Sequence, residues 1–239
     1  MNPIQACGIV AKQREMDSLL VCTMLSMFIF DAIEGAQGNA AGVPLVGGKL
    51  GFALGFVTGK LKASFARDSA QGLSALRRSR VSSVPLMGGA GCLGLGLALA
   101  QPQRQTIVMD GDASLLMELG TLVTVAQSRP RRFLHVVINN GTQFTGLDNM
   151  RAPAPKFDFA AAASNAGYVH TETISDASLW AQRFSALCGI EGPVLVDLKV
   201  DPPPRQTKAG FEQSEMPDMQ FERMGQECAR LQAWLREQS

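Results

Sequence analysis

Asp110-Gly111-Asp112-Ala113-Ser114 and, further along the chain, Asn139-Asn140-Gly141-Thr142 are the two stretches that decide the fold. Each polar turn directly follows a short apolar run of the β type, Thr106 to Met109 before the first and Leu134 to Ile138 before the second. Polar turns that close such runs are expected at the carboxyl ends of parallel strands, where open α/β sheets bind ligands. The sequence therefore predicts an α/β fold with a doubly wound, mostly parallel sheet and helices on both faces.

The two turns supply the oxygen atoms that a magnesium ion takes as ligands. Mg²⁺ prefers octahedral oxygen coordination and usually shares its shell with substrate phosphates and water, so the protein needs to provide few ligands. One carboxylate, one amide oxygen and one backbone carbonyl would suffice, and Asp112, Asn140 and Thr142 offer these groups. The spacing therefore predicts a metal site that holds a diphosphate.

A helix is predicted between the two turns, from Ser114 to Ala126, because apolar side chains recur there at three- and four-residue intervals. Its N-terminal end would point the amides of Ala113 and Ser114, and the Ser114 hydroxyl, at a bound phosphate. Either polar turn alone is more typical of an ordinary loop or helix cap than of a site. Their order, spacing and flanking strands together favour the site.

Glycines gather before the first of these strands. Gly88, Gly89 and Gly91 let the backbone come close to a ligand, and the apolar run from Leu93 to Ala100 predicts a helix packed tightly on the sheet. Close packing of that helix would explain the same glycines without any ligand. Both interpretations stay open from the sequence.

The arrangement resembles the diphosphate-binding domain of thiamin diphosphate (ThDP) enzymes, whose motif is Gly-Asp-Gly followed about two dozen residues later by Asn-Asn. The resemblance covers about residues 82 to 204. It is closest to the sulfopyruvate decarboxylase beta subunit and the matching domain of the phosphonopyruvate decarboxylase family. Ala113 departs from the pattern, since the family most often has glycine there and a methyl group stands to crowd the phosphate.

The resemblance implies the ligands of both cofactors. Magnesium would be bound by Asp112, Asn140 and Thr142. Met87 stands where these enzymes place a bulky apolar side chain beneath the bent cofactor, although a core position is the alternative for a methionine. The residues expected to contact ThDP are Met87, Gly88, Gly89, Gly111, Asp112, Ala113, Ser114, Asn140 and Thr142.

The resemblance also implies that the site is completed by a second chain. In ThDP enzymes a glutamate on a separate pyrimidine-binding domain activates the cofactor, and this sequence shows no such domain before the site. No catalytic residue is therefore assigned within the chain. It is expected to be the beta subunit of a cytoplasmic hetero-oligomer, at least α2β2, whose alpha subunit carries that domain.

The expected activity is ThDP- and Mg²⁺-dependent decarboxylation of a small 2-oxo acid, similar to sulfopyruvate or phosphonopyruvate. A carboligase of the acetolactate synthase type would carry the same half-site. The beta subunit of a 2-oxo acid oxidoreductase would need electron carriers, and the five scattered cysteines show no cluster spacing. A non-catalytic member of the fold is the remaining alternative.

Composition is that of a compact soluble domain, with 46% hydrophobic and 18% charged residues among 239. The net charge of +1 recommends neither nucleic acid nor an acidic membrane surface as a partner. The most apolar run, Leu19 to Phe30, is about twelve residues long, whereas a transmembrane helix needs about twenty. The cytoplasm is therefore the expected location.

Four regions are expected along the chain. Residues 1–34 form the N-terminal part of the ThDP-binding domain, and residues 81–204 its diphosphate- and Mg-binding core. Between them lies a glycine-rich insert, residues 35–80, in which Val43 to Gly48 nearly copies Val84 to Gly89. It is either a local duplication or a merely glycine-rich stretch. Residues 205–239 form a linker and an amphipathic helix that packs on the core or contacts another subunit.

The remaining pattern alternates helices and strands. His135 and His170 lie within predicted strands, so each is interpreted as a structural histidine. The expected helices are Pro3 to Glu15, Met27 to Ile33, Phe157 to Gly167 and Ser178 to Leu187, and the expected strands are Ser18 to Thr23, one at Val84, Tyr168 to Thr173 and Pro193 to Val200.

Overall fold

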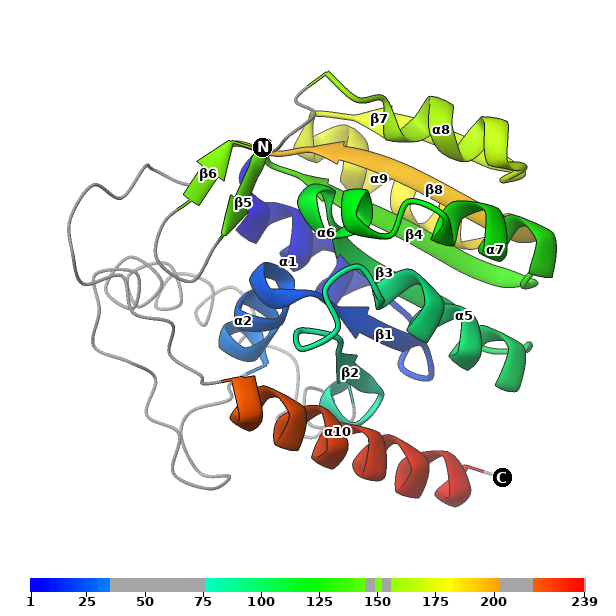
Figure 1. The fold of residues 1–239 in the computed structure, drawn as a ribbon. Coiled ribbons are helices and arrows are strands. Elements are labelled where there is room, and N and C mark those ends of the chain that lie inside the picture. The colour runs from blue at the N-terminus through cyan, green and yellow to red at the C-terminus, as the bar shows by residue number, and fades with distance from the viewer. Residues whose placement is uncertain (35–75, 145–148, 152–155, 203–216, 239) are drawn as a thin grey trace.

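A computed structural model describes residues 1–34, 76–144, 149–151, 156–202 and 217–238 (Figure 1). The predicted duplication within the insert lies outside these residues. Of the insert, only residues 76–80 are described.

The centre of the fold is a six-stranded sheet with the strand order β2-β1-β3-β4-β8-β7. Every neighbouring pair in it is parallel. The strands are β1 (Leu19–Cys22), β2 (Arg80–Ser82), β3 (Thr106–Gly111), β4 (Arg132–Asn139), β7 (His170–Ile174) and β8 (Gly192–Lys199). A separate antiparallel pair is formed by β5 (Thr142–Phe144) and β6 (Asn149–Arg151). The predicted parallel sheet is confirmed.

Helices cover both faces of the sheet, because its central strands are apolar on both sides. One face packs against α1 (Pro3–Gln13), α2 (Met24–Ile33) and α9 (Ala177–Cys188). The other packs against α5 (Ala90–Ala100), α6 (Asp112–Met117), α7 (Thr121–Ser128) and α8 (Phe159–Ala166). This confirms the predicted doubly wound arrangement.

Two local predictions differ from the structure. The helix predicted from Ser114 to Ala126 is split into α6 and α7, because Glu118 is not helical, with φ −132° and ψ 51°. The strand predicted at Val84 begins earlier, at Arg80, and Val84 follows its end. Arg80, the last residue of the region assigned to the insert, lies in β2 and is fully buried beside the carboxylates of Asp31 and Glu34.

The C-terminal helix α10 (Pro217–Glu237) packs along the β2 edge of the sheet (Figure 1). Leu231 and Trp234 are buried against Leu19 and Val81. Docking on the core, one of the two interpretations of this helix, is confirmed for these residues. The spacing of Phe221, Met224, Cys228, Leu231 and Leu235 predicts one apolar stripe on this helix. That stripe is wrong at Phe221, which is 52% exposed.

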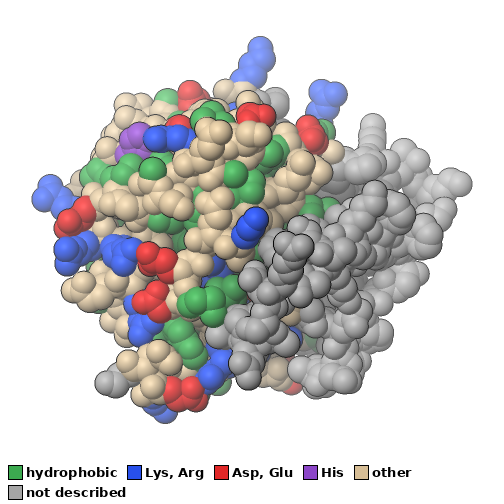
Figure 2. Space-filling model, turned by 180° about the vertical axis from the view of Figure 1, so that it is seen from behind, with side chains coloured by type: hydrophobic (Ala, Val, Ile, Leu, Met, Phe, Trp, Pro, Cys, Tyr) green, Lys and Arg blue, Asp and Glu red, His purple; other side chains and the backbone are tan. Residues whose placement is uncertain are grey.

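The surface carries mixed charge. On the face drawn in Figure 2, Lys and Arg side chains are interspersed with Asp and Glu among apolar and uncharged groups. Within the described residues, no helix combines the length and apolarity that crossing a membrane requires.

Replacing Gly94 in α5 by alanine is expected to lower the free energy of unfolding by about 1–3 kcal/mol, because an added Cβ would lie 2.3 Å from Val108 Cγ2. A Cβ at Gly96, on the same helix, would meet nothing within 4 Å. Gly96→Ala is therefore the matched control and should be neutral or stabilising by up to about 1 kcal/mol. Urea denaturation measures both. Equal stabilities would contradict the close packing of α5 on the sheet.

Candidate cofactor site

The two polar turns meet at the carboxyl edge of the sheet. β3 and β4 are paired in register, with Gly111 opposite Ile138, and α6 begins directly after β3. The Gly141 backbone N–H donates a hydrogen bond of 2.8 Å to the Asp112 carboxylate, at Oδ2. The predicted meeting of the two turns is therefore observed as a direct contact.

Asn140 and Thr142 form the second half of the site. Asn140 Oδ1 accepts hydrogen bonds from the Thr142 backbone N–H at 2.8 Å and from the Thr142 hydroxyl at 2.9 Å. The side chain of the preceding Asn139 does not join this pair, because its amide donates a hydrogen bond of 2.9 Å to Asp197 on β8. Of the two asparagines, Asn140 is thus the one that is hydrogen-bonded to Thr142.

The Asp112 carboxyl is mostly removed from water. Burial raises the pKa of Asp112 to about 6, against the lowering effect of hydrogen bonds from the backbone N–H groups of Ala113 and Gly141. The negative charge of Asp197 adds to the increase. A partly desolvated carboxylate gains strongly from a nearby cation, so this group fits a metal ligand.

The available donors are of the kind that suits a hard cation. The turns offer a carboxylate, an amide oxygen and backbone carbonyls, and such sites leave the remaining positions to phosphate and water. Among the described residues, no three His, Cys, Asp or Glu side chains gather as a metal centre. A metal here would therefore depend on this mixed oxygen set.

The glycine loop lies directly against the first turn. Gly88 has φ +87°, and its N–H donates to the Ser114 hydroxyl oxygen at 3.1 Å. A Cβ on Gly88 would lie 2.4 Å from Glu118 Cγ, so the close approach needs glycine. Gly91 and Gly94 instead allow α5 to pack closely. The helix-packing interpretation is confirmed for Gly91 and Gly94, whereas a ligand contact at Gly88 stays a prediction.

Met87 lies outside the core, with 50% of its surface exposed. The core alternative for this side chain is therefore wrong, because the glycine loop carries it to the surface at the end of β2. Ala113 is 8% exposed, so its methyl group is mostly buried. The contacts with ThDP and Mg²⁺ expected for Met87, Ala113 and the other residues of the site stay predictions.

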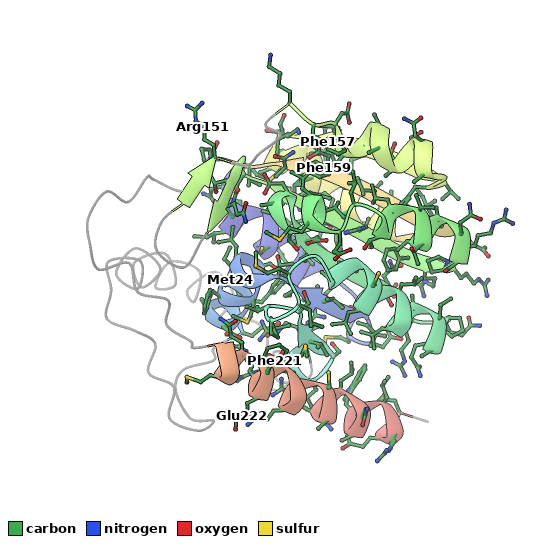
Figure 3. The ribbon with its side chains drawn as sticks, in the orientation of Figure 1. Met24, Arg151, Phe157, Phe159, Phe221 and Glu222 are labelled. Carbon is green, nitrogen blue, oxygen red and sulfur yellow. The ribbon has the colours of Figure 1, made fainter. Side chains whose placement is uncertain are left out.

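Sequence reasoning missed Thr23, which lies beside the first turn. Its hydroxyl oxygen would be 3.8 Å from a Cβ on Gly111, and it donates a hydrogen bond to the Met109 carbonyl. Figure 3 places Met24, which starts α2, and Arg151 of β6 at the same end of the sheet. The missed signal is that Thr23 closes an apolar run just as Asp110 closes the next one.

The histidines have structural partners, as predicted. His135 is fully buried and contacts Asp110 and Tyr168. His170 contacts Glu172, which is also held by Arg183. These interactions explain both residues without a direct chemical role.

Residues 69–198 match the family model described as "Thiamine pyrophosphate enzyme, C-terminal TPP binding domain". Phosphonopyruvate decarboxylase of Streptomyces viridochromogenes is 34% identical over 119 residues, which are 50% of this chain and 30% of that protein. Sulfopyruvate decarboxylase subunit beta of Methanothermobacter thermautotrophicus is 34% identical over 116 residues, 48% of this chain and 59% of that subunit. The match therefore spans less than two thirds of either relative.

A solved structure shows the same fold. The thiamine diphosphate-dependent 4-hydroxybenzoylformate decarboxylase of Rhodococcus jostii RHA1 matches with a TM-score of 0.52 at 18% identity, over 85% of this chain and 33% of that chain. The resemblance predicted from the two turns is confirmed by the family match, which includes both of them.

Proposed function

The chain belongs to the thiamine pyrophosphate enzymes, whose C-terminal TPP-binding domain it contains, and from this we propose that it binds the Mg²⁺–diphosphate end of ThDP. The contact between Gly141 and Asp112 supports the proposal most directly, because it joins the two turns into one site. The complete enzyme would decarboxylate a small 2-oxo acid.

The residues would divide the work of binding. Asp112, Asn140 and the Thr142 carbonyl would hold the metal, and Met87 would lie beneath the cofactor's rings. Backbone and hydroxyl groups of the remaining residues would contact the cofactor; these are Gly88, Gly89, Gly111, Ala113 and Ser114. Bound ThDP would supply, through its thiazolium ring, the electron sink that decarboxylation of a 2-oxo acid requires.

A partner subunit would complete the site. The relative from Methanothermobacter is by name a beta subunit, which supports an alpha subunit that carries the pyrimidine-binding domain and its glutamate. The names of the two curated relatives favour a 2-oxo acid with a sulfonate or phosphonate group. An α2β2 assembly would place one site at each interface.

The test uses the complex isolated from its own cells. We expect its native mass spectrum, recorded with Mg²⁺, to contain a second chain and the mass of ThDP. After EDTA treatment, ThDP plus Mg²⁺ should raise the thermal transition, whereas ThDP plus EDTA or thiamin plus Mg²⁺ should not. A homo-oligomer that responds to none of these additions would overturn the proposal. CO₂ release from sulfopyruvate and phosphonopyruvate then compares the substrates.

A further inference from the structure

A chain of three buried polar side chains leads away from the first metal turn. Asp110 at the end of β3, His135 in the middle of β4 and Tyr168 just before β7 are exposed by 0%, 0% and 6%. His135 Nε2 lies 3.2 Å from Asp110 Oδ2, and His135 Nδ1 lies 3.2 Å from the Tyr168 hydroxyl. The three groups thus connect three strands beneath the site.

Both oxygens of the Asp110 carboxylate are occupied. Oδ1 accepts a 2.8 Å hydrogen bond from the backbone N–H of Gly111, the residue that precedes Asp112. Because a carboxylate only accepts, we assign the N–H of the imidazole to Nε2, which donates to Oδ2, and Nδ1 then accepts from the Tyr168 hydroxyl. These hydrogen bonds therefore fix the rotation of the Asp110 carboxylate, the tautomer of the His135 imidazole and the direction of the Gly111 N–H.

The packing around His135 leaves its ring little freedom. A Cβ on Gly91 of α5 would lie 3.2 Å from His135 Cε1, so the helix approaches the ring as closely as glycine allows. Phe133 meets the imidazole edge to face, with ring centroids 6.0 Å apart. Phe133 and α5 thus lie against the ring, and its two nitrogens contact Asp110 and Tyr168.

Stability alone gives no reason for these residue types. Buried polar groups cost free energy that their hydrogen bonds roughly offset, and apolar replacements of similar shape are often neutral or stabilising. What the polar chain adds is a fixed geometry at the Gly111 amide, one residue from Asp112. Such a support is what a preorganised ligand site requires.

We propose that Asp110, His135 and Tyr168 are positioning residues that hold the Gly111–Asp112 turn in the geometry that binds the Mg²⁺–diphosphate group. The inference rests on the proposed function and deepens it. The three side chains act through the turn and contact neither metal nor cofactor.

The test measures cofactor affinity in the isolated complex with Mg²⁺ at saturation. Tyr168→Phe removes only the hydroxyl and is expected to weaken ThDP binding about 5-fold, whereas His135→Leu should weaken it about 30-fold. His135→Gln keeps an N–H donor for Asp110 and should recover part of that loss. In the ¹⁵N spectrum of labelled histidine, the His135 signals should report protonated Nε2 in the wild type and change in Tyr168→Phe.

Trp180→Phe is the matched control. It also removes one buried hydrogen bond, from Trp180 Nε1 to the Ala6 carbonyl at 3.2 Å, but on the opposite face of the sheet. Trp180→Phe should lower the thermal transition about as much as Tyr168→Phe does, and it should leave the affinity for ThDP unchanged. If Tyr168→Phe and His135→Leu bind ThDP as tightly as this control, the positioning role is overturned. If the wild-type complex itself binds no ThDP, the proposed function fails first, and the two failures are distinguished.

Discussion

Asp112→Asn is expected to abolish Mg²⁺-dependent ThDP binding and, at the same time, to stabilise the cofactor-free chain. Loss of residues that merely support a metal ligand typically costs 10–100-fold in affinity, so loss of the carboxylate ligand itself should exceed about 100-fold. The asparagine oxygen can still accept the hydrogen bond from the Gly141 N–H. The fold of the turn should therefore survive, and titration calorimetry of the complex measures the loss.

The stability gain follows from the sign of the Asp112 pKa change. Burial raises this pKa from 3.8 to about 6, so the folded chain binds the proton more tightly than the unfolded chain does. Without metal, the free energy of unfolding should fall as the pH rises from about 4 to about 6. The loss of stability caused by burying the charged Asp112 carboxylate then remains at neutral pH. Its size is on the order of 1–3 kcal/mol. Asparagine carries no such penalty.

Urea denaturation in EDTA at pH 4 to 7.5 compares the wild type with Asp112→Asn. The variant should be the more stable protein near neutral pH and lack the downward slope. Asp158→Asn is the control, because Asp158 is an exposed carboxylate that caps α8 and asparagine caps equally well. It should change neither stability nor binding. Unaltered ThDP affinity in Asp112→Asn would remove this residue from the metal site.

The same proton should compete with the metal in the wild type. As the proposed metal ligand, Asp112 would have to be charged for binding, so Mg²⁺-dependent ThDP affinity is expected to fall as the pH drops below about 6. The apo protein gains stability over the same interval, so stability and binding change in opposite directions. Such opposite changes are expected of a proposed ligand carboxylate that is placed where burial disfavours its charge.

The central sheet and the meeting of the two turns could be predicted because both depend on local signals. Apolar runs of strand length, each closed by polar residues, fix the strands and the edge at which Asp112 and Asn140 meet. The glycine cluster was also visible in the sequence. Which glycines pack a helix on the sheet and which meet the first turn was not visible, because this depends on the neighbours that Gly88 and Gly91 meet in space.

The sequence predictions that were wrong also failed because they depend on tertiary contacts. The helix break at Glu118 occurs where its side chain packs on Gly88, about thirty residues earlier in the chain, and no local pattern encodes that contact. The apolar character of Met87 and Phe221 suggests burial, yet both are half-exposed in the described structure. Arg80 is the opposite case, a charged residue that is fully buried in a strand, which is rare unless the charge is paired.

Arg80 is held by a network of buried charges at the β2 edge. Its guanidinium contacts Asp31 directly and Glu34 at 3.4 Å, while Glu34 also lies 3.5 Å from Arg14. Arg223 of α10 reaches the second oxygen of Asp31 at 2.5 Å. Burial alone would raise the pKa of Asp31, but Arg80 and Arg223 outweigh it and hold that pKa below its ordinary value. The network joins α1, α2, β2 and α10.

Arg80→Met is expected to lower the free energy of unfolding by about 3–5 kcal/mol. The methionine fills much of the same volume, but it leaves Asp31 and Glu34 buried with one cation fewer. The control is Arg78→Met, two residues away, whose partner Glu237 forms a pair at the surface. An exposed pair of this kind contributes about 0–1 kcal/mol, so the control should unfold almost as the wild type does.

A double variant separates uncompensated charge from lost packing. If the cost of Arg80→Met comes from the excess negative charge left in the buried network, adding Glu34→Gln should recover part of the stability, because it removes one of the two carboxylates that Arg80 balanced. If the cost comes from packing, the second substitution should add a further loss. Urea denaturation of the wild type, both single variants and the double variant gives the coupling free energy. A positive recovery would mean that β2, and with it the loop that carries Met87, is anchored chiefly by charge balance.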